Sequence, residues 1–249
     1  MKNEGGVFGL RPIIEAIESG KTIDKLFVQK GLQGEIFSQL RKLIAQYEIP
    51  TSYVPVEKLN RLTGKNHQGV YAFLSPIEFD SIENVLPQIY ERGKTPFLLI
   101  LDRVSDVRNF GAIARTAECV GIDAIIIPYK GSASVNADAV KTSAGALYNI
   151  PICKENNLKK TVDYLQQSGI VLAAASEKSD TYLYDVDFTT PLAIIMGSEE
   201  DGVSDALLKV SDYIIKLPMA GQTASLNVSV ACGAILYEAV RQRLNVDLF

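Results

Sequence analysis

The sequence predicts an α/β protein whose main part is an open, mostly parallel sheet with helices on both faces, preceded by a small α/β domain. The first observation is a series of short apolar segments without polar interruptions, such as Phe97–Leu101, which are typical of strands buried on both faces. The second is that helical patterns lie between these segments, an alternation that favours parallel sheets. The third is a stretch punctuated by Pro76, Pro87 and Gly93, which separates this part from a shorter alternating part.

The shorter part, residues 1–78, is predicted to form the small α/β domain. Its predicted strands cover Ile23–Val28, Thr51–Val54 and Val70–Leu74, and its predicted helices cover residues 10–19, Glu35–Tyr47 and Val56–Leu62. The spacing of the apolar residues within 35–47 places them on one side of a helix, as packing against a sheet requires. Residues 79–95 contain one weak helical pattern, Ile82–Tyr90, and are interpreted as a linker.

Residues 96–249 are predicted to form the main domain. Its expected strands are Phe97–Leu101, Ala124–Ile127, Ile170–Ala174, Leu192–Met196 and Tyr213–Leu217. Its expected helices are Gly111–Val120, Ala137–Ala146, Leu158–Gln167, Ser204–Leu208 and Leu226–Leu244.

Length and composition limit the class of protein. The chain has 249 residues and is 47% hydrophobic, which is enough for a sizeable core. Polar residues interrupt every apolar stretch before the roughly 18 residues that a membrane span needs. The first residues lack the apolar region of a secretory signal, so we expect a soluble, cytoplasmic protein.

Cysteine and histidine content argues against a metal centre. The three cysteines are scattered and have no CxxC spacing, and His67 is the single histidine. We expect Cys119 and Cys232, which fall in predicted helices, to be small buried apolar residues. His67 is expected to be structural, with contact to RNA as the alternative.

The charge balance does not by itself indicate a nucleic-acid-binding protein. The formal net charge is −4, whereas such proteins usually carry a basic surface. The charge is unevenly distributed, because residues 1–80 hold ten Lys and Arg against nine Asp and Glu, and residues 96–249 hold thirteen against eighteen. Lys58, Arg61 and Lys65 form a local basic cluster in the less acidic part.

Three places in the main domain share one layout, in which an apolar strand ends, a short polar loop follows and a helix begins. They are Leu101–Ala112, Ile195–Gly202 and Leu217–Ala231. Ligands of open parallel sheets bind beyond the carboxyl ends of the strands. We therefore expect these three junctions to converge on one composite site.

Several chemistries are disfavoured by missing motifs. The sequence lacks the G-x-x-x-x-G-K-[ST] loop that holds ATP phosphates and the G-x-S-x-G turn of many hydrolases. It also lacks a G-x-G-x-x-G after any predicted strand, which disfavours a nicotinamide-dependent dehydrogenase. A nucleoside cofactor without phosphate fits this gap, and S-adenosylmethionine is such a cofactor.

The three junctions resemble the three motifs of a known family. Asn109–Ala117 resembles the first motif of the SpoU (TrmH) class of RNA ribose 2′-O-methyltransferases, in the SPOUT superfamily. Met196–Ser204 resembles the second motif, and Leu217–Ala231 with Leu236–Glu238 resembles the third. The motifs occur in the family's order and span most of residues 97–243.

This resemblance implies a function and a fold that the patterns alone do not give. It implies transfer of a methyl group from S-adenosylmethionine to an RNA ribose, and it is greatest to bacterial enzymes that methylate a guanosine in 23S ribosomal RNA. It also implies a C-terminal trefoil knot and a homodimer with its active site at the interface. Residues Phe8–Leu10 and His67–Val70 are similar to the small substrate-binding domain of many members.

The resemblance assigns catalytic roles to Arg115, Asn109, Glu199, Ser225 and Asn227. Arg115 would hold a phosphate or favour the ionised 2′-hydroxyl, because a guanidinium stays charged and makes forked contacts. Without the resemblance, Arg115 reads as a surface arginine paired with Glu118, and Asn109 and Ser225 read as helix N-caps. Glu199 would orient Arg115 or Asn227.

The resemblance also implies the cofactor site. Leu217, Met219 and Leu226 would pack against the adenine, and backbone groups near Gly197 would bond its edges. Apolar walls with few polar groups are typical of pockets for small ligands.

Two alternative functions remain open. One is a tRNA ribose 2′-O-methyltransferase, although such enzymes often lack a domain like residues 1–78 or carry basic extensions. The other is a non-catalytic RNA-binding protein with the same fold. The presence of all five polar site residues argues against the second.

Overall fold

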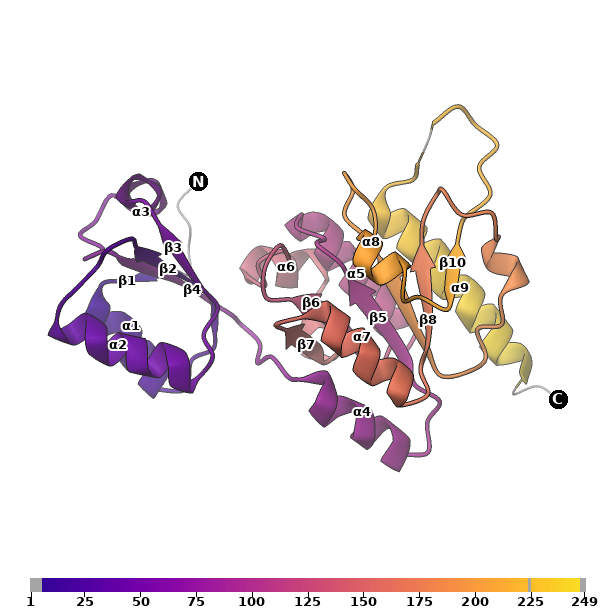
Figure 1. Ribbon diagram of the computed structural model, residues 1–249, viewed down its shortest axis with the longest axis horizontal. Coiled ribbons are helices and arrows are strands. Elements are labelled where there is room, and N and C mark those ends of the chain that lie inside the picture. The colour runs from indigo at the N-terminus through magenta and orange to yellow at the C-terminus, as the bar shows by residue number, and fades with distance from the viewer. Residues whose placement is uncertain (1–5, 224, 247–249) are drawn as a thin grey trace. The chain divides into compact units, whose positions relative to one another are not determined.

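The computed structural model describes residues 6–223 and 225–246, and the chain separates into two compact units (Figure 1). One unit comprises Met1–Glu78 and Ser134–Ala137, and the other comprises Phe79–Ala133 and Asp138–Phe249. Among the described residues, none of the helices has the length and apolar character needed to cross a membrane. Each unit is built on its own sheet.

The smaller unit contains a four-stranded sheet in the order β1-β4-β2-β3. The strands are β1 (Gly6–Phe8), β2 (Ile23–Gln29), β3 (Thr51–Val54) and β4 (Val70–Leu74), and the helices are α1 (Leu10–Glu18), α2 (Glu35–Gln46) and α3 (Val56–Leu62). The apolar sides of α1 and α2 share one core with Leu26, Val28 and Val70. α3 packs on the other face of the sheet. The sequence did not predict β1, since three residues give no periodic pattern.

The larger unit contains a six-stranded sheet in the order β10-β8-β9-β5-β6-β7, and every pairing in it is parallel. The strands are β5 (Phe97–Leu101), β6 (Ala124–Pro128), β7 (Ile152–Glu155), β8 (Val171–Ala175), β9 (Leu192–Met196) and β10 (Tyr213–Ile215). The predicted parallel α/β architecture is therefore confirmed. β7 was not predicted, because Lys154 and Glu155 make half of it charged. The trefoil knot stays a prediction.

The helices of this unit begin and end near the predicted positions, with differences that follow from their caps. They are α4 (Ile82–Glu91), α5 (Val107–Cys119), α6 (Ala137–Thr142), α7 (Leu158–Gln167), α8 (Asp205–Leu208) and α9 (Val228–Val246), with short 3₁₀ turns at Ala146–Tyr148 and Leu183–Asp185. α5 begins four residues before Gly111, the predicted start, because Asp106 caps it. The predicted helix over 137–146 divides, since Ala144 and Gly145 have positive φ.

Helices cover both faces of the sheet. On one face, α4, α7 and α8 pack against alternate residues of the central strands, such as Leu98 and Ile100. α5 and α9 pack against each other on the opposite face (Figure 1). β5 and β9 are consequently buried along their whole length, which explains why their sequences are continuously apolar.

Residues 79–95, which the sequence suggests as a linker, contain α4. Ile82, Val85, Leu86 and Ile89 of this helix are buried in the core of the larger unit. Pro87 is accommodated inside the helix. The domain boundaries at residues 78 and 96 stay predictions.

The cysteines differ in exposure. Cys232 is fully buried in α9, and burial raises the pKa of its thiol to about 12. Burial also raises the pKa of Cys153 in β7. The expectation that Cys119 is buried was wrong, because this residue lies on the exposed side of the last turn of α5.

Arg243, near the end of α9, is hydrogen-bonded to the segments that precede β5 and β9 of the larger sheet. Arg243 donates to the carbonyl oxygens of Phe188 (2.9 Å) and Thr190 (2.8 Å), and to those of Thr95 and Pro96 (both 3.3 Å). Its guanidinium also lies 4.4 Å from the centre of the Phe97 ring. Burial lowers the pKa of this side chain, and the negative charges of Asp123 and Asp187 oppose this effect.

We predict that Arg243→Ala lowers the free energy of unfolding by about 2–3 kcal/mol, because it leaves several carbonyl groups without their charged donor. Urea unfolding followed by circular dichroism measures this change. Arg92→Ala is the control, since Arg92 is exposed at the end of α4 and should barely shift the midpoint. Equal midpoints for the two variants would show that Arg243 does not fasten α9.

Candidate functional site

The three junctions predicted to converge lie at one edge of the larger sheet. β5, β9 and β10 are parallel members of this sheet, so their carboxyl ends point to the same edge. The loop after β5 leads into α5, the loop after β9 contains residues 197–204, and the segment after β10 leads into α9.

Glu199 joins the three junctions. Its Oε1 accepts hydrogen bonds from Asn109 Nδ2 (2.6 Å) and from Asn227 Nδ2 (2.9 Å). Asn227 Nδ2 also donates to Asn109 Oδ1 (3.0 Å). The three side chains come from three different junctions, so the predicted convergence is confirmed. Of the two predicted partners of Glu199, the structure supplies Asn227.

The helix caps at this site are not the predicted ones. Asp106, and not Asn109, caps α5, since its Oδ1 accepts from the amides of Arg108 (2.9 Å) and Asn109 (2.8 Å). α9 begins at Val228, so Ser225 lies too far before it to act as its cap. Asn227 takes that role, because its Oδ1 accepts from the Ser229 amide (3.0 Å) and hydroxyl (2.5 Å).

The cap of α9 fixes the direction of the Asn227 amide. Because Oδ1 of Asn227 faces the start of the helix, its Nδ2 must face Glu199 and Asn109. Asn109 then presents Oδ1 to Asn227 and Nδ2 to Glu199. Within the described residues, Oε2 of Glu199 has no hydrogen-bond partner and remains available to a ligand.

A large cavity of about 700 Å³ lies beside this group, and its volume is typical of small-ligand sites. Its lining includes all four predicted cofactor residues, Gly197, Leu217, Met219 and Leu226, together with Glu199, Ser225 and Asn227. The cavity also has residues that the sequence did not indicate, Ser176, Glu177 and Lys178, which follow β8. They could have been found because β8 ends at the same sheet edge.

Gly197 brings two loop backbones close together beside this cavity. A Cβ atom on Gly197 would lie 1.9 Å from the carbonyl carbon of Gly202. Ser198 and Gly202 also form two backbone hydrogen bonds of 3.1 and 3.0 Å, which close the loop into a tight turn. Only glycine fits at position 197 in this turn.

A second cavity, of about 320 Å³, lies on the Asn109 side of Glu199. Its lining includes Asn109, Asp106, Arg103 and Gly131. Both cavities are lined by Ser198, Glu199, Glu200 and Asp201. Glu199 therefore stands where a larger and a smaller cavity meet.

Arg115 is not part of this group. Its side chain is exposed on α5 and makes no hydrogen bond or ion pair with the described part of the chain, so the alternative pairing with Glu118 is absent. Six residues along an α-helix correspond to a rise of about 9 Å and a rotation of about 240°. Arg115 therefore projects from a different side of α5 than Asn109.

Family models match both units. The SpoU rRNA methylase family model matches residues 96–237, more than half of the chain. The chain belongs to this family. A model described as the substrate-binding domain of RNA 2′-O ribose methyltransferases matches residues 7–80.

Relatives of known name agree with this membership. A Staphylococcus haemolyticus protein, named as a TrmH family tRNA/rRNA methyltransferase, is 34% identical over 240 residues, which cover 96% of each chain. The Bacillus subtilis protein YacO, similarly named, is 33% identical and 95% of each chain is covered. The SpoU methyltransferase AviRb from Streptomyces viridochromogenes, solved in complex with AdoMet, is 28% identical, with a TM-score of 0.62 and coverage of 96% of this chain and 90% of that one.

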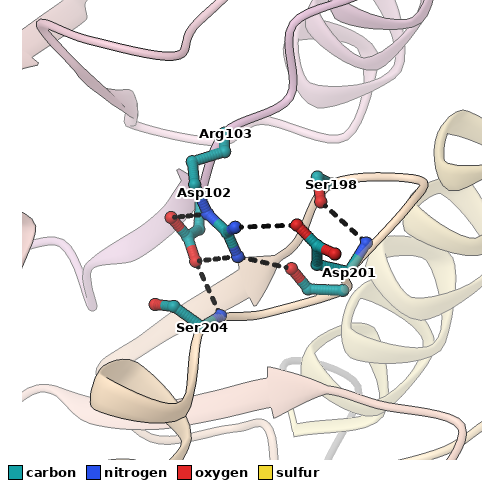
Figure 2. A network of polar contacts seen from close by, with 6 residues as sticks. Asp102, Arg103, Ser198, Asp201 and Ser204 are labelled. Carbon is teal, nitrogen blue, oxygen red and sulfur yellow. Dashed lines mark hydrogen bonds and ion pairs between the residues drawn. The ribbon is translucent and has the colours of Figure 1, made fainter.

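In this SpoU family member, a polar network holds the loop that carries Glu199 (Figure 2). Arg103 donates to Asp102 Oδ1 (3.2 Å), Asp201 Oδ2 (3.2 Å) and Gly202 O (3.1 Å). Asp102 is buried, and its Oδ2 accepts from the Ser204 amide at 2.7 Å. Arg103 and Asp102 thus bind the second half of the turn that includes Glu199.

Arg103 reaches this position through an unusual backbone conformation. Its φ is 62°, a left-handed conformation that costs a non-glycine residue roughly 1–2 kcal/mol. The hydrogen bond to Asp102 is the main reason why the pKa of Arg103 is raised. No sequence pattern indicates this role of Arg103, because its partners Asp201 and Gly202 are 98 and 99 positions away.

We predict that Arg103→Ala loosens the turn at residues 198–204 without unfolding the protein. The amides of Gly202 and Ser204, which are bonded within the turn and to Asp102, should exchange hydrogen at least about tenfold faster. Hydrogen exchange with mass spectrometry measures this, and the amides of α7 serve as the internal control. Unchanged exchange in the turn would mean that Arg103 does not hold it.

Proposed function

We propose that this SpoU family RNA methyltransferase transfers a methyl group from S-adenosylmethionine to a ribose 2′-hydroxyl of RNA, with a guanosine of 23S ribosomal RNA as the target. The observation that supports this is the meeting of two cavities at Glu199. A group transfer needs two substrates to meet at one point. The larger cavity suits the cofactor, and the smaller one suits the acceptor nucleoside.

The chemistry of the larger cavity fits S-adenosylmethionine. Four carboxylates, from Glu177, Glu199, Glu200 and Asp201, line it against the two lysines Lys178 and Lys216. This excess of negative charge favours a cationic ligand and disfavours a phosphate group. Met196, Leu217 and Ile235 supply apolar walls for a purine.

The side chains at the junction position the reacting groups. When bound, S-adenosylmethionine supplies a methyl group that is already activated by its sulfonium, so no enzyme nucleophile is needed. Asn109 and Asn227 hold Glu199, whose second carboxylate oxygen can accept a hydrogen bond from a substrate hydroxyl. Such positioning contributes up to about 7–11 kcal/mol to lowering a barrier.

Arg115 is proposed to act across a homodimer. It projects from another side of α5 than Asn109 and has no partner in the described part of its own chain. An exposed, unpaired guanidinium suits a site completed by a second copy, where it would stabilise the developing alkoxide or hold a phosphate. Ser225 lines the cofactor cavity and is proposed to contact a substrate there.

Ribosomal RNA is favoured over tRNA as the substrate. The family model that covers the larger unit is named for rRNA methylases, and residues 7–80 match a substrate-binding domain. The names of the relatives allow both substrates, since they read tRNA/rRNA. We assign RNA capture to the smaller unit, and a tRNA target is the second candidate.

We predict that Gly197→Ala reduces the affinity for S-adenosylhomocysteine at least about 30-fold, because the added Cβ would displace the turn that borders the cavity. Isothermal titration calorimetry measures the affinity. Gly221→Ala is the control, since a Cβ there meets no atom within 4 Å. If both variants bind like the native protein, the cofactor site lies elsewhere.

We predict that the purified protein incorporates labelled methyl groups into RNA from cells that lack it, at a ribose 2′-oxygen of 23S rRNA. Arg115→Ala should reduce kcat at least about 100-fold while cofactor affinity is kept. Lys159→Ala, an exposed change on α7, is the control. Label found in tRNA alone would favour the second candidate, and label absent from all RNA would refute the proposal.

A further inference from the structure

The four-stranded sheet of the smaller unit has aromatic side chains in direct register on the face opposite α1 and α2. Phe8 of β1 pairs with Tyr71 of β4, and Tyr71 pairs with Phe27 of β2. In the next row along the strands, Phe73 of β4 pairs with Lys25. We call this surface, with Lys58 and Lys65 beside it, the lysine–aromatic face.

The rings form a continuous row that is open on one side. Ring centres are 6.5 Å apart for Phe8 and Tyr71, 5.1 Å for Tyr71 and Phe73, and 6.1 Å for Phe27 and Phe73. Phe27 and Tyr71 are buried with Leu59 of α3, whereas Phe8 and Phe73 are only partly buried. α3 thus covers the middle of the row and leaves the β1 side accessible.

The backbone of β1 also packs closely against this row of rings. The hydroxyl group of Tyr71 lies where a Cβ of residue 6 would be, so only glycine allows the ring to lie flat across β1. Burial raises the pKa of Tyr71, which keeps its hydroxyl protonated. The aromatic row is therefore a fixed part of the sheet.

Three lysines converge on these rings. Lys58 Nζ lies 4.9 Å and Lys25 Nζ 5.5 Å from the centre of the Phe27 ring, and Lys65 Nζ lies 5.6 Å from that of Phe8. None of the three forms an ion pair within the described part of the chain. Their charges are therefore not held in an ion pair within that part of the chain, although the chain as a whole carries −4.

The loop that carries Lys65 is held in place by His67. His67 Nδ1 accepts from the Gly69 amide (3.0 Å), so Nε2 carries the proton and donates to Asn60 Oδ1 of α3 (2.9 Å). Gln68 Oε1 accepts from the Leu10 amide (3.0 Å), which ties the same loop to the start of α1. His67 is buried, and its expected structural role is confirmed.

We propose that the lysine–aromatic face binds a single-stranded segment of the RNA substrate, an inference that rests on the proposed function and deepens it. The lysines neutralise backbone phosphates, and an unstacked base stacks against the accessible side of Phe8 and Phe73. Basic groups interleaved with aromatic rings suit single-stranded RNA, because every base has a face that stacks. A double helix hides these faces and offers only its backbone.

The test uses the full-length protein and a fluorescein-labelled oligouridine of about ten nucleotides, which forms no duplex. Fluorescence anisotropy measures its affinity between about 50 and 200 mM KCl. The variant Lys25→Ala/Lys58→Ala/Lys65→Ala should bind at least about tenfold more weakly, and the salt dependence should lose about 2 units of slope.

A charge-matched control comes from the same unit. Arg11→Ala/Arg41→Ala/Lys42→Ala removes three exposed positive charges from α1 and α2, on the other side of the sheet. It should bind nearly as well as the native protein. If this control loses as much affinity as the lysine variant, net charge and not the face explains the binding, and the proposal is overturned.

Stacking is tested separately. Phe8→Leu keeps an apolar side chain and should weaken oligouridine binding about three- to tenfold. Phe37→Leu, the same change at a buried position of α2, should not weaken it. Circular dichroism melting confirms that each variant is folded at the assay temperature. Equal binding by all folded variants, or a loss confined to a double-stranded RNA probe, would overturn the proposal.

The binding assay distinguishes this inference from the proposed function. If the native protein methylates no RNA but the lysine variant still loses oligouridine binding, the proposed function fails and the face stands. If methyl transfer to RNA is found and the lysine variant binds and methylates like the native protein, the function stands and the face is refuted.

Discussion

The acceptance of two amide hydrogens by one oxygen of Glu199 is the interaction on which the site depends. Asn109 and Asn227 are 118 positions apart in the sequence, and both donate to this atom. The cap that Asn227 provides for α9 determines which way its amide faces, and this in turn determines the orientation of Asn109. The cap at the start of α9 thereby helps to determine the position of the Glu199 carboxylate.

Glu199 can hold the two amides in place only because the turn that carries it is itself stabilised. Asp102 and Arg103 stabilise the turn through hydrogen bonds with Asp201, Gly202 and Ser204. Gly197 lets the two strands of the turn approach. The strained backbone of Arg103 is tolerated because the surrounding contacts determine its conformation, a pattern common at functional sites.

Much of the fold was predictable because it depends on local patterns. Phe97–Leu101 and Leu192–Met196 are apolar throughout since they are central strands, and the sequence placed both correctly. β7 was missed because an edge strand can carry charged residues. The true caps, Asp106 and Asn227, were missed because several polar residues near each helix start were equally suitable by type. The sequence also showed which junctions face one edge, but not the pairing of Arg103 with residues almost a hundred positions away.

The two units of this acidic chain carry charged groups that suit ligands of opposite charge. A cationic cofactor is stabilised by carboxylates, whereas RNA is repelled by them. Four carboxylates line the larger cavity, while three lysines without acidic partners converge on one face of the smaller unit. Because these groups belong to separate units, each unit can carry the charge that its proposed ligand requires. RNA capture and cofactor binding can then each be favourable, and a net charge of −4 is no obstacle to an RNA substrate.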